Sequence, residues 1–257
     1  MKYGICNLSI VPVRAEASDA SELVTQLLFG ELYKVTDTRK KWVKIRMTFD
    51  GYEGWIDRKQ AFELEKDQYQ DLKSQKPVYS SDPLQLIDFP EENDHLFVSQ
   101  GSSLYGFENG SFNWLNESIP FNGQVYDQNM SKADFVDIAL SYLNAPYLWG
   151  GRTPFGIDCS GFSQIVYKIG GKQIPRDASQ QALLGEPLSF IEEAEPGDLA
   201  FFDNSEGLIT HVGILLANNY IIHASGKVRI DRLDQHGIFN NEERAHTHTL
   251  RVIKQIV

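Results

Sequence analysis

The sequence predicts an α+β protein in which two small all-β units precede a domain of helices followed by a mostly antiparallel sheet. Three observations support this fold class. Apolar and polar residues alternate in short runs up to about residue 126, helical spacing starts near residue 131, and strand-like runs return after residue 196. With 257 residues, 42% of them hydrophobic, the chain is long enough to bury a sizeable core.

Residues 1–62 are expected to form a small antiparallel barrel. Apolar and polar positions alternate in the runs YGICNLSIVPVR, LVTQLLFGELYKVTD, KWVKIRM and YEGWID, and Gly30, Gly51 and Gly54 break the pattern. Cys6 belongs to the first run, so we expect it to face the barrel core as an apolar residue.

Residues 63–126 are expected to begin with a charged connector that contains one helical piece. A second set of short strands follows, with the sequences HLFVSQGSSLYGF, SFNWLNES and NGQVYD, and glycines punctuate them. This second unit is therefore predicted to be all-β.

Residues 127–257 are expected to start with two helices. Ser131 is the predicted N-cap of the first, with Asp134 three residues on in a capping-box position. In the second helix, apolar residues recur at i, i+3, i+4 and i+7 from Phe162 to Ile169. This spacing puts Cys159, within GIDCSGF, at the start of the second helix. The later runs GDLAFFD, THVGILL, YIIHAS, KVRIDRL and HTLRVIKQI read as strands.

Charge and cysteine content exclude several classes of function. A net charge of -11 and a pI near 5.0 argue against nucleic acid or an anionic membrane surface as the main partner. Two cysteines are too few for a disulfide framework, and no apolar run approaches the ~18 residues that span a bilayer. We expect a cytoplasmic protein, or a periplasmic one if an export signal has been removed; the sequence carries no signal for an oligomeric state.

Cys159 has the position of a nucleophile. A helix N-terminus carries about half a positive charge, which favours a thiolate, and its backbone N–H groups can hold an oxyanion. Asp158 would cap the helix and oppose the thiolate. We expect the dipole and a neighbouring imidazolium to outweigh one solvated carboxylate.

The base must be a histidine, and of the six only His211 and His223 lie in strongly apolar strands. If the loop between these strands has three residues, Ala217 to Asn219, residues whose numbers sum to 436 face each other. His223 then lies diagonally from His211 on the same face, whereas a two-residue loop would separate the rings. His211 would take the thiol proton and His223 would orient it.

Two alternatives remain for these residues. Each histidine could be a hydrogen-bonded core residue. Cys159, His211 and His223 could instead bind zinc, although they lack the close spacing of typical zinc ligands. We expect no metal ion and no cofactor.

The region from residue 130 to 257 resembles the NlpC-type cysteine peptidases of bacterial cell-wall metabolism. The resemblance rests on PYLWGGRTPFGIDCSGFSQIVYK, IPRDASQQ, PGDLAFF, THVGILL and YIIHAS, which occur in the order typical of the family. It implies a papain-like α+β fold and a catalytic triad of Cys159, His211 and His223. It also implies a supporting role near the oxyanion for Tyr147, which could otherwise be a packing aromatic.

The first unit is similar to a bacterial SH3-like domain, through SELVTQLLFGE and DGYEGWID, and the second unit to a divergent copy. The domains are thus expected at 1–62, 63–126 and 127–257. This arrangement resembles that of peptidases that cut free murein peptides between D-glutamate and the diamino acid. In that subgroup the first barrel closes one end of the cleft, so that only a peptide with a free N-terminal L-alanine fits.

The resemblance also yields candidate substrate-binding residues. An ammonium group is selected by carboxylates and hydroxyls, and a substrate carboxylate by an arginine. The candidates are Tyr52, Glu22, Asp158 and Ser160 for the amine, with Arg176 and Asp177 lining the cleft. Tyr52 could also be a turn aromatic, Glu22 a surface charge, and Arg176 and Asp177 partners in a structural ion pair.

The sequence thus predicts a cysteine endopeptidase that releases L-Ala-D-Glu from murein peptides, with either lysine or diaminopimelate at the third position. One alternative is a non-catalytic protein that binds murein fragments. Another is an amidase or acyltransferase that uses the same Cys-His chemistry on a different acyl donor.

Overall fold

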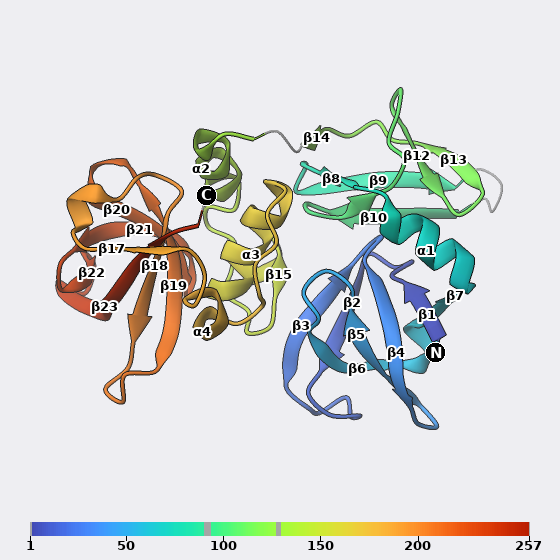
Figure 1. Cartoon of the computed structure of the whole chain (residues 1–257), viewed down its shortest axis with the longest axis horizontal. Coiled ribbons are helices and arrows are strands. Elements are labelled where there is room, and N and C mark those ends of the chain that lie inside the picture. Colours follow the sequence, from blue (N-terminus) through green and yellow to red (C-terminus); the bar gives the residue numbers. More distant parts are fainter. Residues whose placement is uncertain (1, 90–93, 127–129, 257) are drawn as a thin grey trace. The chain divides into compact units, whose positions relative to one another are not determined.

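The computed structural model describes residues 2–89, 94–126 and 130–256 (Figure 1). The chain forms two compact units, residues 1–128 and 129–257. Among the described residues, no helix is long and apolar enough to cross a membrane.

The N-terminal unit begins with an antiparallel sheet in the strand order β3-β2-β6-β5-β4-β1-β7. Its strands are β1 (Lys2–Ile5), β2 (Ile10–Arg14), β3 (Leu23–Leu28), β4 (Leu32–Thr38), β5 (Trp42–Met47), β6 (Glu53–Asp57) and β7 (Phe62–Leu64), with the short helix η1 (Arg58–Gln60) between the last two. Alternate residues of β2 and β5 are buried, as the period of two predicts. Cys6 follows β1 directly, is 1% exposed and packs in the core, which confirms its predicted orientation.

The second half of this unit contains one helix and three small sheets. The elements are α1 (Lys66–Ser74), β8 (Val78–Ser80), β9 (Leu84–Phe89), β10 (Asp94–Ser99), β11 (Ser103–Leu104), β12 (Ser111–Trp114), β13 (Glu117–Pro120) and β14 (Val125–Tyr126). The helix in the connector is as predicted. Strands β8 and β9 are not among the predicted strands, because β8 is three residues long and turn residues follow it at once.

Phe29 joins the first sheet to the core of the second half. Its ring is fully buried among apolar residues of that half and stacks on Trp114 at 4.7 Å between centroids. The backbone N–H of Ser103 donates to the Phe29 carbonyl at 2.9 Å. The predicted boundary at residue 62 therefore lies inside one compact unit, and the division into three domains stays a prediction.

Gly30 should be more sensitive to substitution than Gly51, although both have positive φ, +79° and +77°. A Cβ at Gly30 would lie 2.1 Å from the Ser103 carbonyl oxygen, whereas a Cβ at Gly51 would have no heavy atom within 4 Å. Both Gly→Ala variants carry backbone strain, and Gly30→Ala adds a steric clash. We expect Gly30→Ala to lose about 1–3 kcal/mol more unfolding free energy in urea than Gly51→Ala. Equal losses would contradict the close approach.

The C-terminal unit opens with the helices that the sequence predicts. Helix α2 (Lys132–Ser141) has a capping box between Ser131 and Asp134. Helix α3 (Cys159–Ile169) begins at the cysteine, with Asp158 as its N-cap, and its residues are all buried. A short α4 (Ala178–Gln181) and the two-residue strands β15 (Arg152–Thr153) and β16 (Gly156–Ile157) complete this half.

A seven-stranded antiparallel sheet forms the other half, in the order β17-β23-β18-β19-β20-β21-β22. Its elements are β17 (Glu186–Leu188), η2 (Ile191–Glu193), β18 (Leu199–Asp203), β19 (Ile209–Leu216), η3 (Ala217–Asn219), β20 (Tyr220–Ser225), β21 (Lys227–Asp234), β22 (Gly237–Asn240) and β23 (Ala245–Gln255). Strand β22 also pairs with β23, so six strands close into a barrel and β17 lies outside it. The sequence does not predict this closure, because β22 has four residues and β23 reaches two neighbours through bulges.

The β19–β20 hairpin has the predicted register. Gly213 pairs with His223, so paired numbers sum to 436, and the loop is Ala217–Asn219. Asn218 and Asn219 have φ of 60° and 59°, a conformation that asparagine tolerates well. His211 is two residues from the partner of His223, which confirms the predicted diagonal placement on one face.

Candidate active site

Helix α3 packs against β19 and places the Cys159 sulfur beside the strand that carries His211. The backbone N–H groups of Val212 and Ser160 lie near this sulfur and favour its thiolate form. Because Val212 follows His211 directly, the helix start and the histidine strand meet at the thiol. Cys159 is only 6% exposed.

Burial dominates the acidity of Cys159. Burial, followed by the negative charge of Asp158, raises the pKa of the thiol to about 11, although the Val212 N–H, Arg176 and the Ser160 N–H act in the opposite direction. The expectation that the helix start favours a thiolate is therefore wrong for the resting chain. The sequence shows the helix N-terminus but not the depth of the site, and a charge in a buried site loses its hydration.

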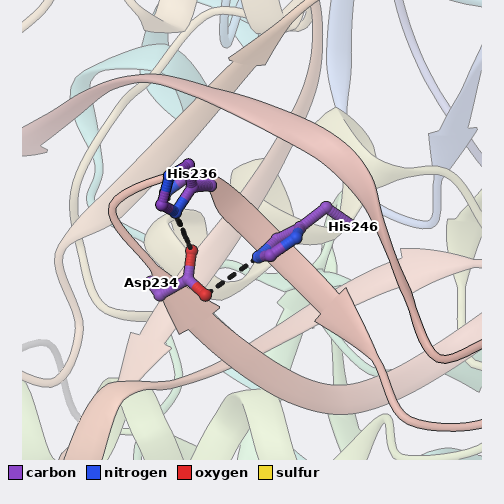
Figure 2. Close-up of side chains that lie close together, drawn as sticks. All are labelled: Asp234, His236 and His246. Carbon is purple, nitrogen blue, oxygen red and sulfur yellow. Dashed lines mark hydrogen bonds and ion pairs between the residues drawn. The ribbon is translucent and has the colours of Figure 1, made fainter.

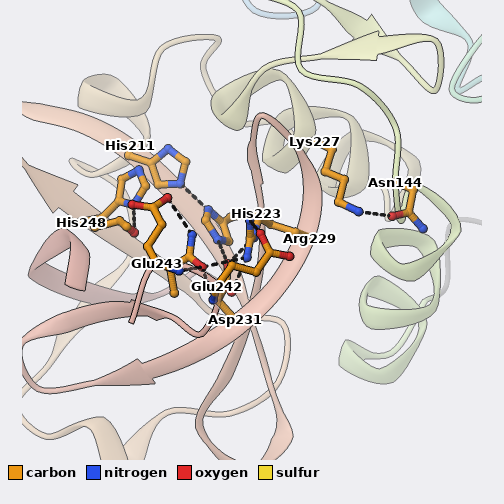
Figure 3. Close-up of polar contacts among 11 residues, drawn as sticks. Asn144, His211, His223, Lys227, Arg229, Asp231, Glu242, Glu243 and His248 are labelled. Carbon is orange, nitrogen blue, oxygen red and sulfur yellow. Dashed lines mark hydrogen bonds and ion pairs between the residues drawn. The ribbon is translucent and has the colours of Figure 1, made fainter. Parts of the chain in front are cut away.

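His211 and His223 are in direct contact (Figure 3). His211 Nε2 and His223 Nδ1 are 2.8 Å apart, and the two residues are 6% and 1% exposed. Burial, and then the nearby His223 and His248, hold the pKa of His211 well below its ordinary value. Both the thiol and its expected base are thus neutral at rest.

Asp231 and Arg229 lie behind His223 and are absent from the predicted site. His223 Nε2 is 3.0 Å from Asp231 Oδ2, and Arg229 donates to both oxygens of Asp231, at 2.6 and 3.0 Å. Burial of Asp231 favours the protonated form, but hydrogen bonds from His223 and Arg229 outweigh it and lower the pKa of this carboxyl. The available signal was the parity of the next hairpin, in which His223 pairs with Arg229.

His248 covers the His211 ring. The ring centroids are 4.2 Å apart with an angle of 31° between the planes, and Phe202 contacts both rings. Burial and the nearby His223 lower the pKa of His248 to about 4, so this ring is neutral at pH 7. No sequence pattern distinguished His248, which lies in a partly exposed strand.

Asp158 forms a buried ion pair with Arg176. Arg176 donates to Asp158 Oδ1 at 3.0 Å and Oδ2 at 2.6 Å, and to the Ser160 hydroxyl at 2.8 Å. Asp158 also accepts from the Gly161 and Gly150 N–H groups, at 2.7 and 2.8 Å. The expected solvated carboxylate is wrong, because Asp158 is 5% exposed. This geometry favours a structural role for Arg176, with Asp158 as one of its partners.

The remaining predicted residues are placed as follows. Tyr147 is half-buried, and burial, followed by the nearby Cys159, raises the pKa of its hydroxyl to about 12. Asp177 occupies the N-cap position of α4. In the N-terminal unit, Tyr52 packs against the barrel core, and Glu22 is exposed just before β3. The substrate-binding roles of these residues stay predictions.

A possible metal site lies on the surface of the C-terminal unit (Figure 2). Asp234 Oδ2 is 2.8 Å from His246 Nε2, and Asp234 Oδ1 is 3.5 Å from His236 Nδ1. All three side chains are exposed.

The zinc alternative at Cys159, His211 and His223 does not fit this geometry well. Zinc there would have to break the hydrogen bond between the two rings, since His211 Nε2 and His223 Nδ1 face each other.

A cysteine at a buried helix start, packed on an antiparallel barrel that presents a bonded histidine pair, defines a cysteine peptidase of the papain-like fold. The model of the NlpC/P60 family matches residues 144–245, and that of the bacterial dipeptidyl-peptidase Sh3 domain matches residues 13–60. A γ-D-glutamyl-L-lysine dipeptidyl-peptidase of Bacillus subtilis (strain 168) is 31% identical over 221 residues, covering 78% of this chain and 71% of that protein. The chain belongs to the NlpC/P60 family.

Two further proteins are similar over most of the chain. Dipeptidyl-peptidase 6 of Lysinibacillus sphaericus is 25% identical, covering 89% of this chain and 91% of that one. The crystal structure of an NlpC/P60 family protein from Bacillus cereus ATCC 10987 has a TM-score of 0.82 at 22% identity and covers 99% of both chains. This structural likeness supports the fold, an NlpC/P60 papain-like domain with an SH3 domain.

Removing the charge of Asp158 should destabilise the C-terminal unit. Asp158→Asn removes the carboxylate of the buried ion pair with Arg176, and we expect a loss of about 3–5 kcal/mol in the free energy of unfolding. Asp137→Asn, on the exposed side of α2, should change it by less than about 0.5 kcal/mol. Urea unfolding of both variants measures the difference. A wild-type-like stability of Asp158→Asn would argue that the pair serves the substrate and not the fold.

Alkylation should report the neutral resting thiol. Because the pKa of Cys159 is raised to about 11, the thiolate fraction grows with pH well beyond 8. We expect the rate of iodoacetamide labelling to rise about tenfold per pH unit from pH 7 to 9. Cys159→Ala gives the background from Cys6. A rate that is already maximal near pH 6 would show instead a preformed thiolate and imidazolium.

Proposed function

We propose that this cysteine peptidase hydrolyses the γ-D-glutamyl to L-diamino acid bond of free murein peptides and releases L-Ala-D-Glu. The observation that carries the proposal is the His211–His223 pair, bonded at 2.8 Å beside the Cys159 helix, in a chain related to dipeptidyl-peptidases over most of its length. The activity of the related dipeptidyl-peptidases suggests which bond is cut, and the Cys-His site suggests the chemistry.

In the proposed reaction, the Cys159 sulfur attacks the γ-glutamyl carbonyl carbon while its proton passes to His211. The imidazolium then gives this proton to the leaving amine as the C–N bond breaks and a thioester remains. Water hydrolyses the thioester with His211 again as the base. Since thiol and imidazole are neutral at rest, proton transfer accompanies the attack.

Tyr147 is proposed to support the oxyanion. Its hydroxyl keeps its proton at neutral pH, because burial and the nearby Cys159 raise its pKa to about 12. A protonated hydroxyl beside the nucleophile can donate to the negative oxygen that develops during attack.

Recognition of a free N-terminal amine is proposed to involve Glu22 and Tyr52 of the barrel together with Asp158 and Ser160. Asp158 already has Arg176 as its counter-ion, so its net pull on an ammonium group is small. Glu22, an exposed carboxylate, therefore carries more of the proposed selectivity.

Two further properties belong to the same proposal. The segment 63–126 is proposed to be a divergent second SH3-like unit, in line with its short antiparallel strands. The cytoplasm is the proposed place of action, because the proposed substrate is a free peptide and not the intact wall.

Product analysis tests the proposed function. The peptide L-Ala-γ-D-Glu-L-Lys, its diaminopimelate counterpart, their N-acetylated forms and intact murein are each incubated with the protein, and products are identified by mass spectrometry. We expect L-Ala-D-Glu from the two free peptides alone, and no product with Cys159→Ala. The proposal fails if Cys159→Ala is as active as the wild type, or if intact murein alone is cut. Circular dichroism of the variant checks that it folds.

A further inference from the structure

We propose that Asp231, held in place by Arg229, is a positioning residue that fixes the proton arrangement of both histidines and leaves Nδ1 of His211 free to accept the thiol proton. The proposal rests on the catalytic roles given above for Cys159 and His211. It adds Asp231 and Arg229 to the three residues Cys159, His211 and His223.

His211, His223 and Asp231 lie on three consecutive strands of the barrel, β19, β20 and β21. Gly213 of β19 pairs with His223 of β20, and His223 pairs with Arg229 of β21. His211 and Asp231 are each two residues from these partners, so each is a diagonal neighbour of His223 on the same face. One register rule, applied twice, thus forms the line from His211 to His223 and Asp231 (Figure 3).

The hydrogen bonds determine which ring nitrogens carry hydrogen. An ionised carboxylate only accepts, so His223 Nε2, 3.0 Å from Asp231 Oδ2, must be the donor. In the tautomer with hydrogen on Nε2 alone, His223 Nδ1 is an acceptor, and His211 Nε2 donates to it at 2.8 Å. Neutral His211 then carries its hydrogen on Nε2, and its Nδ1 lone pair is free for the thiol proton.

Arg229 keeps Asp231 in the form that this arrangement needs. Its Nε and Nη2 donate to the two oxygens of Asp231 at 2.6 and 3.0 Å, and both residues are largely buried, with side-chain exposures of 17% and 3%. Arg229 also donates to Glu242 at 3.2 Å and to Asn240 at 3.2 Å, which hold the guanidinium from β22 and the segment after it. The carboxylate is therefore fixed in position as well as ionised.

The other groups around His211 do not compete for its hydrogen. The Phe202 and His248 rings lie 5.7 and 4.2 Å from the His211 ring, between centroids. The His248 ring is tilted by 31° against that of His211. His211 Nε2 is bonded to His223 Nδ1, so Asp231 acts on His211 through His223.

The test compares Asp231→Asn with Asp137→Asn, the same chemical change at an exposed position of helix α2. An asparagine amide can donate to His223 Nε2, so it no longer enforces hydrogen on that atom, and His211 can carry its hydrogen on Nδ1. We expect kcat to fall by about 10²–10⁴ with KM within about threefold for Asp231→Asn. Asp137→Asn should stay within about twofold of the wild type.

Nitrogen-15 NMR of the histidine rings reads the proton arrangement without any substrate. We expect wild-type His211 and His223 to carry hydrogen on Nε2, and Asp231→Asn to shift both toward Nδ1–H. Unchanged ring signals in Asp231→Asn, or wild-type His223 with hydrogen on Nδ1, would overturn the inference. If the rings behave as expected but no murein peptide is cut, the proposed function fails and this inference stands.

Arg229→Gln covers the case in which Asp231→Asn does not fold. This variant keeps the carboxylate acceptor but removes its cation, so the pKa of Asp231 rises toward or above its ordinary value. We expect wild-type ring signals at pH 8 and an acid limb of the kcat profile that moves to higher pH. An Arg229→Gln variant with hydrogen on His211 Nδ1 at pH 8 would contradict the role of the carboxylate.

Discussion

The hydrogen bond between His211 and His223 depends on the number of residues in one loop. Three residues between β19 and β20 place the two rings on the same face of the barrel, and one residue more or fewer would move them to opposite faces. The position of Cys159 depends on the same strand, because helix α3, which begins at Cys159, packs against β19. The line of contacts from the thiol to Asp231 thus follows from strand register.

Burial then favours the neutral forms of Cys159 and His211. Cys159, His211 and His223 are each less than 7% exposed, and an isolated charge on any of them would lose its hydration. A thiolate and an imidazolium formed together are opposite charges in a region of low dielectric, where their attraction is strong. A buried site therefore discourages each charge alone but tolerates the pair, which ties ionisation to the moment of attack.

Local patterns in the sequence predicted the parts that local forces determine. The capping box of Ser131, the helix start at Cys159 and the hairpin with its odd loop depend on residues close in the chain. The closure of the barrel by β22 and β23 and the insertion of Phe29 into another core depend on distant pairings. The same parity argument, applied to the next hairpin, could have predicted Asp231. The burial of Asp158 could not be predicted locally, because it depends on Arg176, eighteen positions on, and on how deeply the helix start is covered.

A buried Asp–Arg pair and a partly buried one lie at the two ends of the line that runs from Cys159 to His223. Asp158 holds the helix start with its oxygens, and Arg176 offsets a charge that would otherwise oppose the thiolate. Asp231 fixes the His223 ring through a hydrogen bond. Arg229 offsets the negative charge of Asp231, which would otherwise favour a second proton on His223 instead of one on His211. In both pairs the carboxylate supplies directional hydrogen bonds, and the guanidinium limits its net field. The two pairs thereby fix the positions of the Cys159 helix start and of His223, while the thiol proton can move from the Cys159 sulfur to His211.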